Sequence, residues 1–361
     1  MIASSGARDA LLVIVGAGAS HDAAPSVAGD HQTPPLTKDL AYPSAHAMKL
    51  SERYKECQPL LAELRRALKP PSNPPGLAEE STTIEDALRL YIGRRETDPH
   101  ISKHVAAMRF YLRDLMWETA GFVHGHDGGV TNYTSLVART YGWAAEHGSH
   151  VCFVSFNYDP LLEWACEAHF GLEPDDLNSY TADPTASVLK PHGSVLWYWP
   201  YIYRNPAMAE YPRWAKAIRA GEPKEPLATP IHAAGSPTDD ASWGGEWLPT
   251  LPALALPIAG KSTFVWPPEQ REFIDGFRRG AFSRVLTIGW RAAEPHFLDL
   301  IRPKVANDAR VLAITGGNQK VASNEAGAVL DAIAPERPMR QTAVEGFKAS
   351  LDQGTLDWIF A

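Results

Sequence analysis

Residues 11–20 read LLVIVGAGAS. A short run of apolar, largely β-branched residues is typical of a strand buried on both faces of a parallel sheet. Gly16 and Gly18 follow at once, and glycine in this place permits a tight turn into a helix. A strand, a glycine turn and a helix start can present backbone N–H groups to a phosphate. The stretch therefore predicts the first strand of an α/β sheet and a candidate phosphate-binding turn.

The strand–helix alternation returns in the middle and at the end of the chain. Strands are predicted in HVCFVSF (150–156), SVLKPHGS (187–194), RVLTIGW (284–290) and RVLAITGG (310–317). Helices are predicted directly after 150–156, 284–290 and 310–317. This order favours an α/β fold with one doubly wound, Rossmann-like parallel sheet. We expect a single domain over residues 1–361, its core at about 8–40, 150–195 and 280–335.

Two segments interrupt that alternation. Residues 44–148 place apolar side chains at helical spacing and predict a helical insertion. Residues 195–270 hold many prolines and tryptophans with little periodicity. We expect a loop-rich layer there and not a disordered linker, because its aromatic residues have apolar surface to bury.

Composition narrows the class of protein. The net charge of −8 and the isoelectric point near 5.9 give no electrostatic reason for direct nucleic-acid binding. The apolar run 11–15 is too short to span a membrane. Three cysteines in 361 residues point to a reducing compartment, so we expect a cytoplasmic protein. No two of them share a C-x-x-C spacing, which excludes a four-cysteine zinc module.

Polar or glycine residues follow several predicted strands at their carboxyl ends, where open α/β sheets bind ligands. Asn157 and Asp159 follow 150–156, His192 lies in KPHGS, and Gly289 follows 284–288. Each has a structural alternative: a turn and helix cap for Asp159 before a proline, a core position for the histidine, and close helix–strand packing for the glycine turn. The turn at 16–21 lacks the third glycine of G-x-G-x-x-G, and no acidic residue follows a second strand at the usual distance. A nicotinamide-reducing oxidoreductase is therefore disfavoured.

As an ordered set, GAGAS, FNYD, KPHGS and IGW resemble the sirtuin-like superfamily. The likeness is strongest to its bacterial, zinc-free branch of NAD-hydrolysing domains found in anti-phage defence proteins. The stretches PPLTKDL (34–40), TTIEDAL (82–88), TNYTSLV (131–137) and PALALPIAGKSTFVWP (252–267) are similar to that branch too. The resemblance covers about residues 10–335. The chain departs from protein deacetylases, because it lacks their paired C-x-x-C module and their Pro-Asp-Phe-Arg segment after the glycine turn.

The resemblance implies roles for eight residues. Asn157 would contact the nicotinamide riboside and hold the attacking water, and His192 would be the catalytic imidazole working through ribose hydroxyls. The remaining six would bind NAD+: the diphosphate and adjoining ribose (Gly16, Ala17, Gly18, Ser20), the nicotinamide end (Asp159) and the adenosine side (Gly289). NAD+ would be the substrate, and no metal is expected. His124, His126 and Asp127 are a weaker metal candidate, since a glycine-rich loop between helices is the commoner interpretation.

The function that the resemblance implies is NAD+ hydrolysis to nicotinamide and ADP-ribose, used to deplete NAD+ during phage infection. Such domains commonly act as homo-oligomers or with a separate defence subunit, an argonaute-like protein or a translocase-type ATPase. Two alternatives stay open. One is an NAD-dependent deacylase or ADP-ribosyltransferase, and the other is a catalytically silent module that senses NAD or ADP-ribose.

Overall fold

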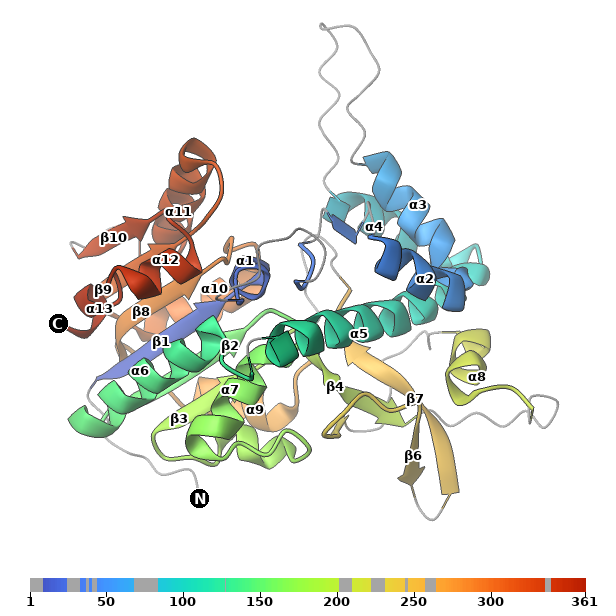
Figure 1. The fold of residues 1–361 in the computed structure, drawn as a ribbon, viewed down its shortest axis with the longest axis horizontal. Helices are drawn as coiled ribbons and strands as arrows, with labels where there is room; N and C mark the ends of the chain where they lie inside the picture. Colours follow the sequence, from blue (N-terminus) through green and yellow to red (C-terminus); the bar gives the residue numbers. More distant parts are fainter. Residues whose placement is uncertain are drawn as a thin grey trace, which may run out of the picture.

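A six-stranded parallel sheet forms the centre of the chain, in the order β10-β9-β8-β1-β2-β3 (Figure 1). The computed structural model describes residues 9–24, 33–36, 39–40, 44–67, 84–126, 128–200, 210–221, 231–243, 246–256, 264–334 and 339–361. The strands of the sheet are β1 (Ala10–Val15), β2 (His150–Ser155), β3 (Ala186–Leu189), β8 (Phe282–Ile288), β9 (Val305–Ile314) and β10 (Arg340–Ala343). The prediction of an α/β fold with a parallel sheet is confirmed.

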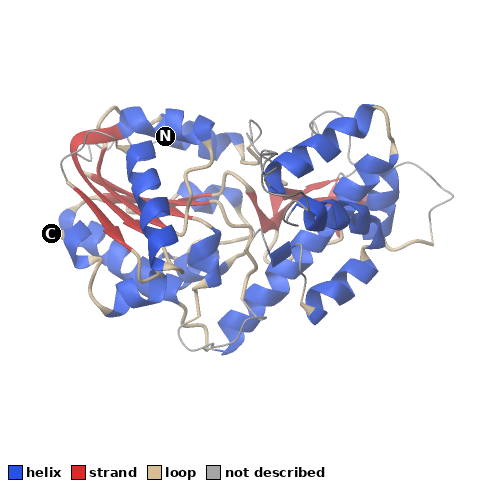
Figure 2. Ribbon diagram, turned by 90° about the horizontal axis from the view of Figure 1, so that it is seen from above, coloured by secondary structure: helices blue, strands red, loops and turns tan. Residues whose placement is uncertain are grey.

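Helices cover both faces of this sheet (Figure 2). Alternate side chains of β1 enter two separate cores, with Leu11, Val13 and Val15 in one and Leu12 and Ile14 in the other. The first core is closed by α6 (Asn132–His147), α7 (Leu161–Phe170), α12 (Phe347–Asp352) and α13 (Asp357–Phe360). The second is closed by α9 (Pro268–Asp275), α10 (Pro295–Ile301) and α11 (Gln319–Ile333). Burial on both faces explains why β1 is a continuous apolar run in the sequence.

The strand order reverses beside β1. The chain passes from β1 to β2 and β3 on one side, and its later strands β8, β9 and β10 lie on the other. A reversal of this kind leaves a crevice at the carboxyl ends of the two central strands, because the connections leave in opposite directions. The carboxyl ends of β1 and β8, with the glycines that follow them, border this point.

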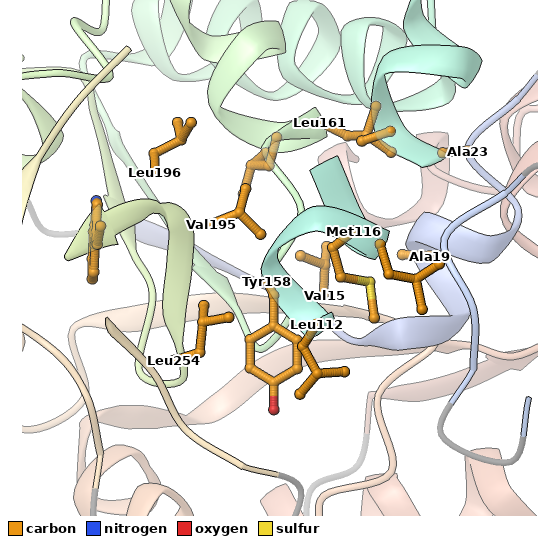
Figure 3. Packing of buried hydrophobic residues seen from close by; sticks show 14 of the residues in the cluster. Val15, Ala19, Ala23, Leu112, Met116, Tyr158, Leu161, Val195, Leu196 and Leu254 are labelled. Carbon is orange, nitrogen blue, oxygen red and sulfur yellow. The ribbon is translucent and has the colours of Figure 1, made fainter. Parts of the chain in front are cut away.

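The predicted helical insertion contains α2 (Ala45–Arg53), α3 (Gln58–Ala67), α4 (Ile84–Gly93) and the long α5 (His100–His126). Short 3-10 turns lie at Lys55–Cys57, Arg94–Glu96, Leu177–Thr181 and Arg302–Lys304. Figure 3 shows Leu112 and Met116 of α5 among Val15, Tyr158 and Leu254, in one apolar cluster. The insertion therefore shares a core with the sheet domain.

The segment for which we predicted a loop-rich layer contains regular structure as well. A four-stranded antiparallel sheet has the order β5-β4-β7-β6. Its strands are β5 (His232–Ala233), β4 (Gly193–Pro200), β7 (Glu246–Leu254) and β6 (Asp240–Trp243), and α8 (Arg213–Ala220) lies beside them. Most of β4 is buried, so its sequence shows no alternation, and Pro249 and Pro252 obscure the strand pattern of β7.

Candidate functional site

The turn between β1 and α1 (Ala17–His21) packs backbone to backbone against the end of β8. Gly16 N–H donates to the carbonyl of Ile288 at 2.9 Å, and Gly18 N–H donates to the carbonyl of Gly289 at 3.2 Å. A Cβ on Gly18 would lie 2.9 Å from Cα of Gly289, which itself has a φ of 59°. The glycines thus serve the close packing that the sequence left open as an alternative. Ala17 stays exposed, and Gly18 and Gly289 stay partly exposed, at the carboxyl edge of the sheet.

Asn157 ties the loop after β2 to this turn. Its Nδ2 lies 2.9 Å from the Gly16 carbonyl, 2.8 Å from Ser20 Oγ and 3.1 Å from the Tyr133 hydroxyl. The Gly16 carbonyl can only accept a hydrogen bond, which fixes the orientation of the amide. The side-chain oxygen of Asn157 accepts no hydrogen bond from the described residues. That oxygen is the part of Asn157 that a ligand or water can use.

Ser20 and Tyr133 complete a buried polar network. Their hydroxyl oxygens lie 3.0 Å apart, so one of the two hydroxyls donates to the other. Ser20 also acts on the Asp159 carboxylate and lowers the pKa of that group. Burial raises the pKa of Tyr133, which keeps the phenol protonated. Ser20 is thus surrounded by protein groups, and its predicted contact with the NAD+ diphosphate and ribose stays a prediction.

Asp159 lies just before Pro160, the N-cap residue of α7. Its Oδ1 accepts the N–H of Leu161 at 3.2 Å, which is the helix-start role that the sequence left open. Burial raises the pKa of the Asp159 carboxyl, and Lys190 opposes that shift. The Lys190 ammonium donates to the Asp159 backbone carbonyl at 2.7 Å. Asp159 therefore faces the protein interior, and its predicted contact with the nicotinamide end stays a prediction.

Lys190 and Glu163 form an ion pair that is fully buried. Lys190 Nζ lies 2.7 and 2.8 Å from the two oxygens of Glu163, and Ser194 Oγ donates to Glu163 Oε1 at 2.7 Å. The ammonium has three oxygen partners and both carboxylate oxygens accept a hydrogen bond, as a buried pair requires. The pair joins α7 to the loop after β3.

His192 lies at the end of β3, against the loop after β2. Its Nδ1 is 3.3 Å from the Phe156 carbonyl, and its ring contacts the Phe156 ring at a centroid distance of 4.9 Å. Its Nε2 lies 3.7 Å from Oε1 of Glu294, in the loop after β8. The histidine is only 4% exposed, as expected for the core position that the sequence left open as an alternative. The Glu294 carboxylate nevertheless gives it a charged neighbour.

The loops after β2 and β3 are joined at several points. Besides the Lys190 and His192 contacts, Val195 N–H donates to the Tyr158 carbonyl at 2.9 Å. Asn157 and His192, the two predicted catalytic residues, therefore lie on neighbouring loops that side-chain hydrogen bonds and the start of β4 join at one edge of the sheet. The structure places Gly16, Ala17, Gly18, Ser20, Asp159 and Gly289 at that same edge.

The sequence reasoning missed Tyr133, Glu163, Lys190 and Glu294 as members of this arrangement. Tyr133 lies in TNYTSLV and Lys190 lies in KPHGS, two stretches that the sequence analysis singled out. Neither stretch indicates which residue these side chains contact. Glu294 has no motif around it, and only the fold brings it to His192.

A metal site and a membrane-spanning helix are both absent from the described residues, which do form a polar cleft. Within the described residues, no group of three or more His, Cys, Asp or Glu side chains is placed to hold a metal ion. Asp127 lies outside those residues. No helix in the described part of the chain is long and apolar enough to cross a bilayer. A polar cleft of about 460 Å³ lies between α2, α5 and residues 236–239, and no predicted site residue lines it.

Comparisons with known proteins give weak similarities. No protein-family model matches the chain, and no curated protein matches it. Among solved structures, a Sir2 homologue mutant with ADP-ribose is 11% identical, with a TM-score of 0.40 over 97% of this chain and 91% of its own. A second such mutant complex is 13% identical, with a TM-score of 0.39 over 95% and 89%. A structure described under the mechanism and regulation of Sir2 enzymes is 12% identical, with a TM-score of 0.36 over 97% and 92%. Similarity at this level carries no functional conclusion, so the function is argued from the contacts above.

Proposed function

We propose that this protein is an NAD+ nucleosidase that cleaves the nicotinamide–ribose bond to give nicotinamide and ADP-ribose. One observation carries the proposal: Asn157 and His192 lie on bonded loops at the carboxyl edge of the sheet, beside the glycine turn and the reversal of strand order. Open α/β sheets bind nucleotides at this place. The order of motifs that resembles the sirtuin-like superfamily supports the same conclusion.

The chemistry asks little of a general acid. Nicotinamide leaves from NAD+ as a neutral base, because the electron pair of the broken C–N bond neutralises the pyridinium charge. The transition state resembles an oxocarbenium ion, as in other glycosyl transfers. Water then adds at the sugar carbon and loses a proton. Asn157 offers a neutral amide oxygen, which can orient this water without the strong binding that a charged group would impose. His192 offers an imidazole that can accept a proton from a ribose hydroxyl.

The turn after β1 sets how the diphosphate would approach. The N–H groups of Gly16, Gly18 and Ala19 donate to backbone carbonyls. A contact with the diphosphate would therefore come from the exposed edge at Ala17 and Gly18, where the absence of side-chain bulk lets a ligand approach closely. Gly289 extends that edge toward β9 and would meet the adenosine side.

The test is nicotinamide release from NAD+ followed by chromatography. We expect His192→Ala to lower turnover by roughly 10²–10⁴-fold, the usual loss for a general base. Asn157→Ala should lower it by roughly 10²–10³-fold, as for one polar contact to a transition state. His296→Ala is the matched control, because this histidine is exposed on α10. Wild-type rates in folded His192→Ala and Asn157→Ala would refute the assignment of the site.

The same assay separates the alternatives. Free ADP-ribose as the product supports hydrolysis, whereas label retained on a protein or an acyl acceptor supports an ADP-ribosyltransferase or deacylase. Binding of NAD+ without turnover supports a silent sensing module. Hydrolysis is preferred because Asn157 and His192 are each buried, and water is the acceptor that buried residues most readily admit.

We further propose that the activity depletes NAD+ as an anti-phage defence and is switched on by assembly. The partner would be further copies of this chain or a separate defence subunit, of the argonaute-like or translocase-type ATPase kind. The resemblance to sirtuin-like defence domains, which commonly act as homo-oligomers or with a separate subunit, supports regulation by assembly. An isolated monomer that cleaves NAD+ at the full rate would overturn this part of the proposal.

A further inference from the structure

Glu294 is a buried carboxylate to which the reaction above gives no role. It lies between β8 and α10 and is 9% exposed. One of its oxygens, Oε2, accepts the indole N–H of Trp290 at 2.7 Å. The other, Oε1, lies 3.7 Å from Nε2 of His192. The indole thus aims the second oxygen at the imidazole.

The four residues around this contact close a ring. Trp290 stacks on Phe156, with centroids 5.5 Å apart and planes inclined by 3°. The Phe156 carbonyl lies 3.3 Å from His192 Nδ1. Phe156 thereby holds the imidazole while Trp290 holds the carboxylate, and the two aromatic rings hold each other. The spacing of Glu294 and His192 is therefore set from both sides.

The hydrogen positions of the imidazole follow from its partners. A carbonyl oxygen can only accept, so Nδ1 carries the hydrogen that faces Phe156. In the neutral ring Nε2 then holds a lone pair toward the Glu294 carboxylate, which brings no attraction. A proton on Nε2 turns the contact into an ion pair. The carboxylate consequently favours the imidazolium that forms when His192 takes a proton from a ribose hydroxyl.

We propose that Glu294 is a positioning residue whose carboxylate stabilises the protonated form of His192 during NAD+ cleavage. This inference rests on the proposed function. The carboxylate faces Nε2, the nitrogen that takes the proton, so it acts on the charge of the imidazolium once that proton has arrived. Trp290 is the group that keeps the carboxylate in place.

Two further ionisable groups near His192 face it or its loop. Tyr158 lies with its ring centroid 6.3 Å away, and its pKa is raised mainly by burial, with Arg109 lowering it and Glu294 raising it. Lys190, two residues before the histidine, directs its ammonium to Glu163 and the Asp159 carbonyl. Glu294 is the carboxylate in direct line with Nε2.

The first experiment follows the titration of His192 by NMR in protein with isotope-labelled histidine, with the resonance assigned by its loss in His192→Gln. We expect Glu294→Gln to lower the titration midpoint by about one unit, the size that a unit charge at this distance gives even in a water-like dielectric. Trp290→Phe should lower it by a smaller amount, because the carboxylate stays but is no longer aimed. Glu269→Gln, an exposed carboxylate on α9, should leave it unchanged. An unchanged midpoint in both Glu294→Gln and Trp290→Phe would overturn the inference.

The second experiment measures the pH profile of NAD+ cleavage. In Glu294→Gln the maximal kcat should fall by up to about 10-fold, the factor that one pKa unit represents, with little change in KM. The acidic limb should move to lower pH by the same amount as the NMR midpoint. A merely structural role would lower kcat without moving the limb, and that result would overturn the inference. The two proposals fail separately, because the NMR titration is independent of turnover. A wild-type protein that leaves NAD+ intact refutes the proposed function and still reports the coupling of His192 to Glu294.

Discussion

Replacing Lys190 by methionine tests the buried ion pair that joins α7 to the loop after β3. The change keeps an unbranched apolar stem of similar size and removes the ammonium. Lys190 and Glu163 are both 0% exposed, with Nζ 2.7 Å from the nearer carboxylate oxygen. Lys190→Met leaves the Glu163 carboxylate in the core with only the Ser194 hydroxyl beside it.

The size of the effect follows from this geometry. A pair of unit charges 2.7 Å apart attracts by about 6 kcal/mol at an effective dielectric constant of about 20. Burial of each ion opposes most of that gain, so the intact pair contributes little net stability. Removing one partner leaves the burial penalty of the other, which is about 3–5 kcal/mol. We expect Lys190→Met to lower the free energy of unfolding by that amount.

Urea unfolding followed by fluorescence and circular dichroism measures the loss. Lys348→Met is the matched control, because its ion pair with Asp352 is exposed and spans 3.4 Å. That control should cost less than about 1 kcal/mol. Adding Glu163→Gln to Lys190→Met removes the stranded charge and should recover at least half of the loss.

The loss should also depend on pH. Burial raises the pKa of Glu163 and Lys190 lowers it, so the pKa of Glu163 rises further in Lys190→Met. Between the unfolded and the raised folded pKa, the folded state binds the extra proton, and stability falls as pH rises. The difference from wild type should therefore widen between about pH 5 and pH 8. A loss equal to that of Lys348→Met, or one that is constant over this range, would refute the reasoning.

Two further predictions concern the turn and the hydroxyl network. Gly289→Ala should cost several kcal/mol more than Gly148→Ala in the same unfolding assay. Both glycines have a φ of 59°, but a Cβ on Gly289 would lie 2.4 Å from a backbone nitrogen of α1, whereas one on Gly148 meets nothing within 4 Å; equal losses would contradict the close packing. Tyr133→Phe should lower stability by about 1–3 kcal/mol and reduce NAD+ turnover, because it removes the hydroxyl between Ser20 and Asn157. Tyr111→Phe should be neutral or stabilising, since that buried hydroxyl has no partner within the described chain; a Tyr133→Phe protein as stable as Tyr111→Phe would remove the network from the site.

The central sheet was readable from the sequence because its inner strands are buried on both faces. β1 and β2 are entirely buried and appear as unbroken apolar runs. The edge strand β10 escaped notice because its residues are partly or fully exposed up to the last, and it lies beyond the core range that we predicted. β4 and β7 escaped notice for another reason, since burial and prolines remove the alternation by which an antiparallel strand is recognised.

The candidate site was readable only in part, for a related reason. Asn157, His192 and Gly289 could be predicted because each lies within three residues of the end of an apolar strand. The end of a strand is a local feature that the sequence shows. Their partners are not local. Tyr133 meets Ser20 across 113 residues, and Glu294 reaches His192 from a loop on the far side of β1. No spacing in the chain marks such pairs, so only the order of strands in the sheet makes them neighbours.

Asn157 shows why the structural and the chemical interpretations of a polar strand end need not exclude each other. Its Nδ2 fastens the glycine turn to the loop after β2, and its Oδ1 is the atom that can hold water. Asn157→Ala removes both the Nδ2 hydrogen bonds and the amide oxygen. A fall in turnover alone would therefore not show that the oxygen takes part in the reaction. Tyr133→Phe weakens the same network and leaves the amide in place. A larger fall in turnover for Asn157→Ala than for Tyr133→Phe, at equal loss of stability, therefore measures what the amide oxygen itself contributes.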